Sequence, residues 1–329
     1  MNLYPLKFTA IPKEKIWGGN RLNTILNKGF DPNAKTGESW EISGLADDIS
    51  VVKNGFLEGN DLEELIEVYM GDLVGDKVYE QFGIEFPLLI KFIDANENLS
   101  IQVHPDNEFA LEKHKAYGKT EMWYIIDAEK DSELIIGFNP TVDKNIFLNA
   151  IQEGNIPEIV NREKTEADNC YLIPAGRIHA TGKGVLFAEI QQTSDITYRI
   201  HDWNRKDDEG NERELHLGLA KEVLDYTYEK KHKTDYESKI NESSEIIRCP
   251  FFTTNILEFN KDIEKDYFKL DSFVIYICLE GNCDIKFEDE KPVSLTKGET
   301  VLIPASLKNL TLSPKQKTKL LEVFIQPEQ

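Results

Sequence analysis

The chain has 329 residues, 40% of them hydrophobic and 10% aromatic, a composition that excludes a disordered protein and suffices for one large or two ordinary domains. Its 38 Lys and Arg residues against 59 Asp and Glu residues leave a formal net charge of −21, which excludes nucleic acid and anionic membranes as expected partners because both attract basic surfaces. The first residues contain no basic segment followed by a long apolar run, so we expect a cytoplasmic protein. Four cysteines without metal-binding spacing are expected to be buried thiols in a reducing compartment.

The amino-terminal half combines strand-like and helical patterns. Residues 1–58 alternate short apolar runs with Gly and Asn turns, which is typical of strands joined by loops. Apolar residues then recur at helical spacing from Asp61 to Phe82, and Gly83 follows, so a helix is predicted there. Three shorter helices are predicted at 107–115 (capped by Asp106 or Asn107), at 145–161 (interrupted near Gly154-Asn155) and at 215–226.

Residues 170–179 and 300–309 form an internal repeat with a constant offset of 130. Each copy contains a strand-like apolar run that ends in Ile-Pro-Ala, at Ile173 and at Ile303. A strand, a Gly turn, a second strand and this turn are typical of a cupin jelly roll. We therefore predict a mostly β fold of two cupin-type jelly-roll barrels, the first carrying helical insertions.

The repeat also predicts two domains. Residues 1–230 would form a metal-binding catalytic domain, and residues 231–329 a second barrel, with the Lys- and Glu-rich segment 226–241 as linker. In the second copy Asn309 stands where the first copy has His179, and no Gln-x-His sequence precedes it. We therefore expect the carboxy-terminal barrel to keep the fold without a metal.

Four polar side chains suggest a divalent metal site in the first barrel. Gln102 and His104 alternate with apolar residues, so they lie on one face of a strand that Pro105 ends. Glu121 opens another strand-like run, and His179 follows a Pro-x-Gly turn. Two imidazoles, a carboxylate and an amide oxygen make a plausible four-ligand site. Because these ligands carry one negative charge, a bound divalent ion would stay net positive and suit Lewis-acid chemistry.

At this point the sequence resembles the type I mannose-6-phosphate isomerases, and in particular the short bacterial members of that family. The resemblance covers most of the chain and depends on several segments together: Lys91-Phe92-Ile93, residues 99–106, 118–121, 16–19, 37–43, 194–199 and 201–203. It implies the cupin fold and one Zn²⁺ per chain, held by Gln102, His104, Glu121 and His179. The residues alone equally allow manganese, cobalt or iron.

The resemblance implies further residues near the substrate. Lys119 lies two residues before Glu121, so on a strand both would share a face. Lys91 lies inside an apolar run, where lysine is rarely buried unless paired or functional. The family also places an acid and an arginine at Asp195 and Arg199. The four residues Lys119, Arg199, Asp195 and Lys91 are therefore the predicted catalytic set.

The implied reaction interconverts mannose 6-phosphate and fructose 6-phosphate through an enediolate. A proton leaves one carbon and returns to its neighbour, so a base with a pKa near neutrality is needed. Lys119, Lys91, Asp195 and a metal-bound water are the candidates, and a nearby cation would lower the pKa of a lysine. Arg199 would stabilise the enediolate or hold phosphate. Arg177 meets phosphate or lies at the surface, and the sequence does not decide between the two.

Two other functions remain open from the residues. Two histidines and a glutamate also match the iron triad of a cupin dioxygenase, although Gln102 as a fourth ligand argues against a site left open for oxygen. A non-catalytic sugar-binding cupin would bind metal and sugar without turnover, and retention of Lys119 and Arg199 argues against it. The identity of the metal and of the base, the phosphate-binding residues, the oligomeric state and the range of phosphosugars stay undetermined by the sequence.

Overall fold

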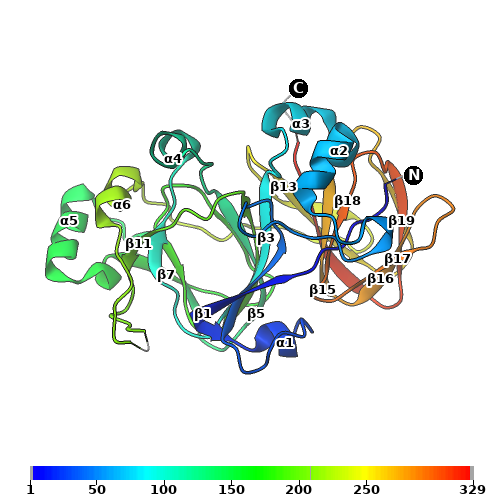
Figure 1. Cartoon of the computed structure of the whole chain (residues 1–329). Coiled ribbons are helices and arrows are strands. Elements are labelled where there is room, and N and C mark those ends of the chain that lie inside the picture. Colours follow the sequence, from blue (N-terminus) through cyan, green and yellow to red (C-terminus); the bar gives the residue numbers. More distant parts are fainter. Residues whose placement is uncertain (1–2, 208, 327–329) are drawn as a thin grey trace.

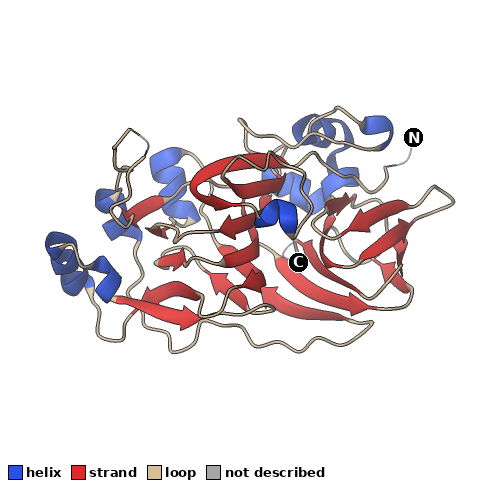
Figure 2. Cartoon of the chain, turned by 90° about the horizontal axis from the view of Figure 1, so that it is seen from below, coloured by secondary structure: helices blue, strands red, loops and turns tan. Residues whose placement is uncertain are grey.

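The computed structural model describes residues 3–207 and 209–326, and within them the fold is mostly β. Its strands form four antiparallel sheets arranged as two barrels, seen on the left and right of Figure 1. Figure 2 shows that the strands form the body of the molecule and that most helices lie at its periphery. The predicted pair of jelly-roll barrels is confirmed.

The first barrel is built from a larger and a smaller sheet. The larger sheet contains, in spatial order, β1 (Ile11–Gly19), β2 (Thr36–Ile42), β3 (Leu88–Ala95), β10 (Val185–Gln192), β5 (Glu121–Ala128) and β8 (Cys170–Ile173). The smaller contains β11 (Tyr198–His201), β4 (Ile101–Val103), β9 (His179–Thr181), β6 (Glu133–Phe138) and β7 (Val160–Lys164). All residues of β3 and β10 are buried, as expected for central strands covered on both faces.

The second barrel has the same arrangement of two sheets, with fewer strands in each sheet. One sheet contains β12 (Ser243–Arg248), β13 (Thr253–Phe259), β20 (Thr318–Phe324), β15 (Val274–Glu280) and β18 (Thr300–Ile303). The other contains β14 (Ile263–Asp266), β19 (Asn309–Pro314), β16 (Asn282–Lys286) and β17 (Val293–Thr296). The sequence repeat corresponds to β8 and β18, which occupy the same edge position beside β5 and β15.

The helices largely follow the sequence pattern. They are α1 (Arg21–Thr24), α2 (Leu62–Val74), α3 (Asp76–Phe82), α4 (Asn107–His114), α5 (Lys144–Glu153) and α6 (Leu217–Val223), with single 3₁₀ turns at Gly55–Leu57 and Ile156–Glu158. Asp106 caps α4, because its carboxylate accepts a hydrogen bond from the backbone N–H of Phe109 at 2.9 Å. Gly154 ends α5 with a φ of 72°, a conformation that glycine adopts without strain.

The single helix expected from Asp61 to Phe82 is wrong, because Gly75 divides it into α2 and α3. Gly75 has a φ of 99°, and a Cβ there would lie 2.6 Å from the carbonyl oxygen of Asp271. The carboxylate of Asp271 also accepts the backbone N–H groups of Asp76 and Lys77 at the start of α3. The break thus lets a loop of the second barrel approach the helix pair.

Contacts between the two barrels are extensive. Leu6 pairs with Leu302 of β18, and the N–H of Ala305 donates to the carbonyl of Leu73 in α2. One continuous apolar cluster includes residues of both larger sheets, among them Ile190 and Leu321. No helix in the described part of the chain is long and apolar enough to cross a membrane.

Candidate metal centre and active-site cavity

Three predicted metal ligands meet inside the first barrel. His104 lies just beyond the end of β4, Glu121 begins β5 and His179 begins β9, and all three side chains are buried. Their ligand atoms all lie within 4.8 Å of one another. Gln102 joins them because it is the direct partner of His179 in the β4–β9 ladder.

Both imidazoles are oriented by backbone carbonyls. Nδ1 of His104 lies 2.8 Å from the carbonyl oxygen of Ile196, and Nδ1 of His179 lies 2.8 Å from that of Arg177. A carbonyl only accepts, so Nδ1 carries the proton in each ring and the lone pair of each Nε2 points into the site. Burial lowers the pKa of His179 to about 4 and that of His104 well below its usual value, so both rings are neutral ligands at neutral pH.

Glu121 supplies an acceptor between the two rings. Its Oε1 lies 3.4 Å from Nε2 of His179, and its Oε2 lies 3.5 Å from Nε2 of His104. Both oxygens are fully buried; among the described residues Oε1 has no hydrogen-bond partner, and Oε2 has the ammonium of Lys119 at 2.9 Å as its only cationic neighbour within ion-pair distance. Burial, together with the charge of Glu189, raises the pKa of Glu121 to about 7, although Lys119 opposes this rise. A buried carboxylate with one unpartnered oxygen is costly, and a divalent cation is a partner that would remove this cost.

The spacing of these atoms fits a tetrahedral ion. With bonds of about 2.0–2.1 Å, a tetrahedral ion holds neighbouring ligand atoms roughly 3.4 Å apart. The two Glu121–histidine distances, one from each carboxylate oxygen, are close to this value, and the amide nitrogen of Gln102 lies 3.3 Å from Nε2 of His179. Because a carboxamide flip exchanges nitrogen and oxygen, Gln102 can present Oε1 at that position. His104, Glu121 and His179 could therefore hold a metal ion, and Gln102 lies where it could join them.

Lys119 lies against the same ligands. Its Nζ is 2.9 Å from Oε2 of Glu121 and 3.2 Å from Nε2 of His104, and its side chain is buried. Desolvation, which lowers its pKa, is outweighed by the charges of Glu121 and Glu189, so the pKa of Lys119 is raised. The lowered pKa expected for this lysine thus depends on the charge of a bound cation, which opposes that of Glu121.

A cavity of about 230 Å³ opens beside the cluster and is lined by Lys91, Gln102, Lys119, Asp195, Arg199 and others. Its wall carries five cationic side chains against three carboxylates: Lys15, Lys91, Lys119, Arg199 and Arg213 against Glu38, Glu189 and Asp195. In a chain with a net charge of −21, this local positive excess favours an anionic ligand.

Lys91 and Glu189 form a buried pair on the cavity floor. They are direct partners in the β3–β10 ladder, and Nζ of Lys91 lies 3.0 Å from Oε1 of Glu189. Nε1 of Trp123 donates to the other oxygen at 3.0 Å. Desolvation of Glu189 is outweighed by Lys91 and Lys119, which lower its pKa to about 2. Glu189 is therefore ionised and rigidly held.

Arg199 and Asp195 lie at the open side of the cavity. Arg199 is the partner of Gln102 in the β11–β4 ladder, which places it beside the metal cluster. One of its terminal nitrogens donates to the carbonyl of Glu214 at 2.9 Å, while its Nε is buried without a hydrogen-bond partner. Arg213 lines the same side and is held by the carboxylate of Asp202. Two guanidinium groups thus face the cavity.

The surface and phosphate alternatives for Arg177 are both wrong. The side chain is buried and pairs with Glu229 at 2.7 Å and with Nδ1 of His232 at 3.2 Å, away from the cavity. Its contribution to the site is the carbonyl that orients His179. Conversely, the sequence analysis missed four charged residues of the wall: Lys15, Glu38, Glu189 and Arg213. Of these, only Glu189 gives a sequence signal, as a single acid inside an apolar strand.

Size alone does not locate the site. A larger cavity, about 940 Å³, lies between the amino-terminal segment near Tyr4 and the hairpin near Phe287. It contains none of the clustered ligands. Convergent polar groups and shifted pKa values, which mark functional sites, occur instead in the wall of the smaller cavity, at Lys119 and Glu189, and in the adjacent ligand cluster.

Comparisons with known proteins agree with this site. The family model for the type I phosphomannose isomerase catalytic domain matches residues 5–147. The chain is 36% identical to mannose-6-phosphate isomerase ManA of Bacillus subtilis, over 93% of this chain and 95% of that protein. It is 34% identical to mannose-6-phosphate isomerase of Streptococcus mutans, over 93% and 94% of the two chains.

A solved structure gives the same result. The crystal structure of mannose 6-phosphate isomerase from Bacillus subtilis superposes with a TM-score of 0.86 and 33% identity, covering 98% of this chain and 99% of that one. The fold and the buried cluster of potential metal ligands are those of a cupin metalloenzyme. The chain belongs to the type I phosphomannose isomerase family.

Proposed function

We propose that this protein interconverts mannose 6-phosphate and fructose 6-phosphate through an enediolate, using one Zn²⁺ per chain. The observation that carries this proposal is the cluster of His104, Glu121 and His179 beside a cavity with an excess of cationic side chains, connected to it by Lys119, which contacts the cluster and lines the cavity. The relatives at 34–36% identity bear the name of this activity. A metal at the barrel mouth and a wall suited to an anion are what a phosphosugar isomerase needs.

The metal ligands are proposed to be Gln102, His104, Glu121 and His179. Two neutral imidazoles, one carboxylate and one amide leave a bound divalent ion with net positive charge. When bound, that ion supplies Lewis acidity toward the oxygens of the sugar at carbons 1 and 2. The backbone carbonyls of Ile196 and Arg177 hold the rings in place, so the ligands are preorganised.

Lys119 is the proposed proton carrier. Its Nζ lies at the boundary between the ligand cluster and the cavity, within reach of a sugar placed there. Lys91 and Asp195 line the same cavity and remain alternatives for the base. The pair of Lys91 with the ionised Glu189 favours a role in positioning hydroxyl groups, because both partners are already committed to each other.

Arg199 and Arg213 are proposed to bind the phosphate. Guanidinium groups recognise phosphate oxygens in a bidentate manner, and both arginines line the cavity. The orphaned Nε of Arg199 offers a donor that an oxyanion would satisfy. This placement leaves the other end of the sugar directed toward the metal.

The molecule is proposed to divide its roles between residues 1–230, which supply the catalytic site, and residues 231–329, which form a barrel without metal. Phosphorylated sugars do not cross lipid bilayers unaided, which is consistent with a cytoplasmic site of action. The net charge of −21 disfavours nucleic acid as a partner.

A coupled assay separates this function from its rivals. The metal-loaded protein should convert mannose 6-phosphate to fructose 6-phosphate at the same rate with and without oxygen. A rate that requires oxygen would instead indicate a cupin dioxygenase. Binding of mannose 6-phosphate without any turnover would indicate a non-catalytic sugar-binding cupin.

A further inference from the structure

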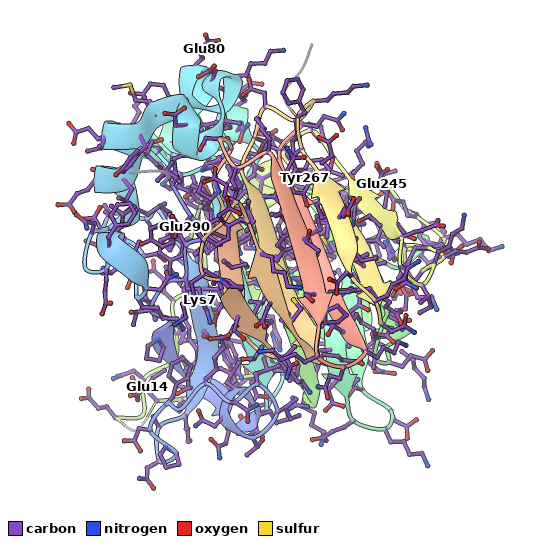
Figure 3. The ribbon with its side chains drawn as sticks, turned by 90° about the vertical axis from the view of Figure 1, so that its right-hand side faces the viewer. Lys7, Glu14, Glu80, Glu245, Tyr267 and Glu290 are labelled. Atoms are coloured by element: carbon purple, nitrogen blue, oxygen red, sulfur yellow. The ribbon has the colours of Figure 1, made fainter. Side chains whose placement is uncertain are left out.

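The second barrel contains a polar cavity at the position that the active site occupies in the first. We call it the distal cavity, and it measures about 480 Å³. It lies between the edge strands β12 and β14. Its polar lining includes Ser243, Asn255, Lys265, Asp266, Tyr267 and Glu322. Figure 3 faces this barrel and shows Tyr267 toward one end of its strands.

Strand register shows that Glu322 corresponds to Glu189. In the first barrel Ile173 pairs with Glu121, and two residues along β5, Trp123 pairs with Glu189 of β10. In the second, Ile303 pairs with Val274 of β15, and two residues along, Tyr276 pairs with Glu322 of β20.

The neighbour on the other side also corresponds. Lys91 of β3 is the partner of Glu189, and Asn255 of β13 is the partner of Glu322. Both barrels therefore place a buried carboxylate at the same point of the same central strand.

Donors surround Glu322 on all sides. Oε1 lies 2.6 Å from Nζ of Lys265 and also accepts the hydroxyl of Tyr267. Oε2 accepts from Ser243 and from the amide of Asn255, each at 2.9 Å. Lys265 donates in turn to Ser243 at 2.8 Å, so the network reaches the cavity mouth.

A network of this kind is not explained by stability alone. Replacing a buried ion pair with well-packed apolar residues is often neutral or stabilising, so a structural role does not require Glu322 and Lys265. Buried apolar side chains of the same barrel show the apolar alternative, with Leu312 and Leu320 fully buried. The charged cluster coincides with the cavity, which indicates a ligand.

The chemistry of the wall selects the class of ligand. Carboxylate, ammonium, amide and hydroxyl groups alternate around the distal cavity and suit hydroxyl groups, which both donate and accept. Four carboxylates face the cavity against the single ammonium of Lys265: Glu242, Glu264, Asp266 and Glu322. This negative excess is opposite to the charge of the active-site cavity and disfavours phosphate. Phe324 and Leu270 add an apolar surface for the C–H face of a sugar ring.

We infer that the distal cavity binds an uncharged hexose, as a second sugar site separate from the metal centre. This second site would have a function other than isomerisation, because an uncharged hexose lacks the phosphate that the first cavity favours. The test is equilibrium binding of D-mannose, D-glucose and D-fructose to the metal-loaded full chain, measured by ligand-observed NMR.

Three variants distinguish binding at the distal cavity from binding elsewhere on the protein. Ser243→Tyr places a ring in the cavity mouth at an exposed position of an edge strand, so it is expected to fold. Ser294→Tyr is the matched control, because Ser294 is exposed on β17 at the opposite edge of the same barrel. His104→Ala removes a ligand of the metal centre and leaves the distal cavity intact. Isomerase activity should be unchanged in both serine variants.

The expected result is saturable binding of one hexose per chain by at least one of the three sugars. Ser243→Tyr should weaken this binding about tenfold or more, while Ser294→Tyr and His104→Ala leave it unchanged. Inorganic phosphate should not displace the bound sugar. The inference is overturned if none of the sugars saturates the protein, if Ser243→Tyr binds as the unchanged protein does, if His104→Ala abolishes binding, or if phosphate competes.

Discussion

The two barrels differ at the residues that correspond to the proposed metal ligands, as the equivalent edge strands β8 and β18 show first. Ile173 of β8 faces Glu121, whereas Ile303 of β18 faces Val274. On the smaller sheets, His179 of β9 pairs with Gln102, whereas Asn309 of β19 pairs with Asp266.

The position that corresponds to His104 also differs between the two barrels. His104 follows Gln102 by two residues and is buried, whereas Phe268 follows Asp266 by two residues and is 78% exposed. All four proposed metal positions therefore differ between barrels that share strand order and register. The frame is maintained by apolar strands and turns, so the ligands can change while the fold persists.

The largest expected effect comes from the ligands that only the first barrel has. His104→Ala and His179→Ala should each lose the metal and nearly all isomerase activity, because no neighbouring side chain replaces the missing Nε2. Metal content by elemental analysis and turnover by coupled assay check this. His201→Ala is a suitable control, since His201 lies outside the cavity. Full activity with metal retained in either ligand variant would disprove the site.

The next effect concerns the cations that distinguish the two cavities. Lys119→Met should lower kcat by about 10²–10⁴-fold, the usual cost of losing a general base. Arg199→Met should also raise KM, because it is proposed to hold phosphate. Kinetics with metal content checked measure both. Lys164→Met and Arg162→Met alter exposed cations elsewhere and should behave as the unchanged protein. Near-native kcat in Lys119→Met would contradict the role of Lys119 as the base, which would then be Lys91, Asp195 or a metal-bound water.

A third prediction uses what the barrels share, the buried carboxylates Glu189 and Glu322. Each has a folded pKa below the ordinary value of 4.5, about 2 for Glu189. The unfolded chain then binds more protons as the pH falls below about 4.5, so this contribution to stability is present above that pH and lost toward pH 2. Glu189→Gln and Glu322→Gln should each cost roughly 3–5 kcal/mol at neutral pH, by leaving Lys91 or Lys265 unpaired.

The measurement is the free energy of unfolding in denaturant between pH 7 and pH 3. Each glutamine variant should show a smaller loss of stability on acidification than the unchanged protein. Glu166→Gln, at an exposed position, serves as control and should follow the unchanged curve. Parallel acid curves for the variants and the unchanged protein would show that these carboxylates do not carry the acid sensitivity.

The smallest expected effect is the restoration of one ligand in the second barrel. Asn309→His should leave the metal content at one ion per chain, because Val274 and Phe268 supply no ligand at the positions of Glu121 and His104, and the new histidine and Asp266 alone make two ligands. Elemental analysis of the purified variant checks this. A content near two ions per chain, in this variant or in the unchanged protein, would contradict the proposed loss of the second site.

The features that the sequence predicted correctly are those encoded locally. The offset of 130 located β8 and β18, and Asp106 was a correct cap for α4, since a cap depends on three successive residues. The convergence of His104, Glu121 and His179 was also predicted, because each lies at the end of a strand in a recognisable motif.

The features that the sequence did not predict depend on tertiary contacts. The break of the expected helix at Gly75 coincides with the approach of a loop of the second barrel. Arg177 lies directly after the Pro-x-Gly turn that the sequence predicted. The sequence does not indicate that its side chain points toward Glu229. Arg213 enters the cavity from a loop 14 residues beyond Arg199, a placement that depends on its pairing with Asp202.

Removal and return of the metal test the central claim most directly. The purified protein is treated with a chelator, dialysed and assayed for conversion of mannose 6-phosphate to fructose 6-phosphate before and after addition of Zn²⁺. We predict that turnover disappears with the metal and returns when about one equivalent of Zn²⁺ per chain is restored. Turnover that continues at its full rate in protein shown to be free of metal would contradict a metal-dependent isomerase centred on His104, Glu121 and His179.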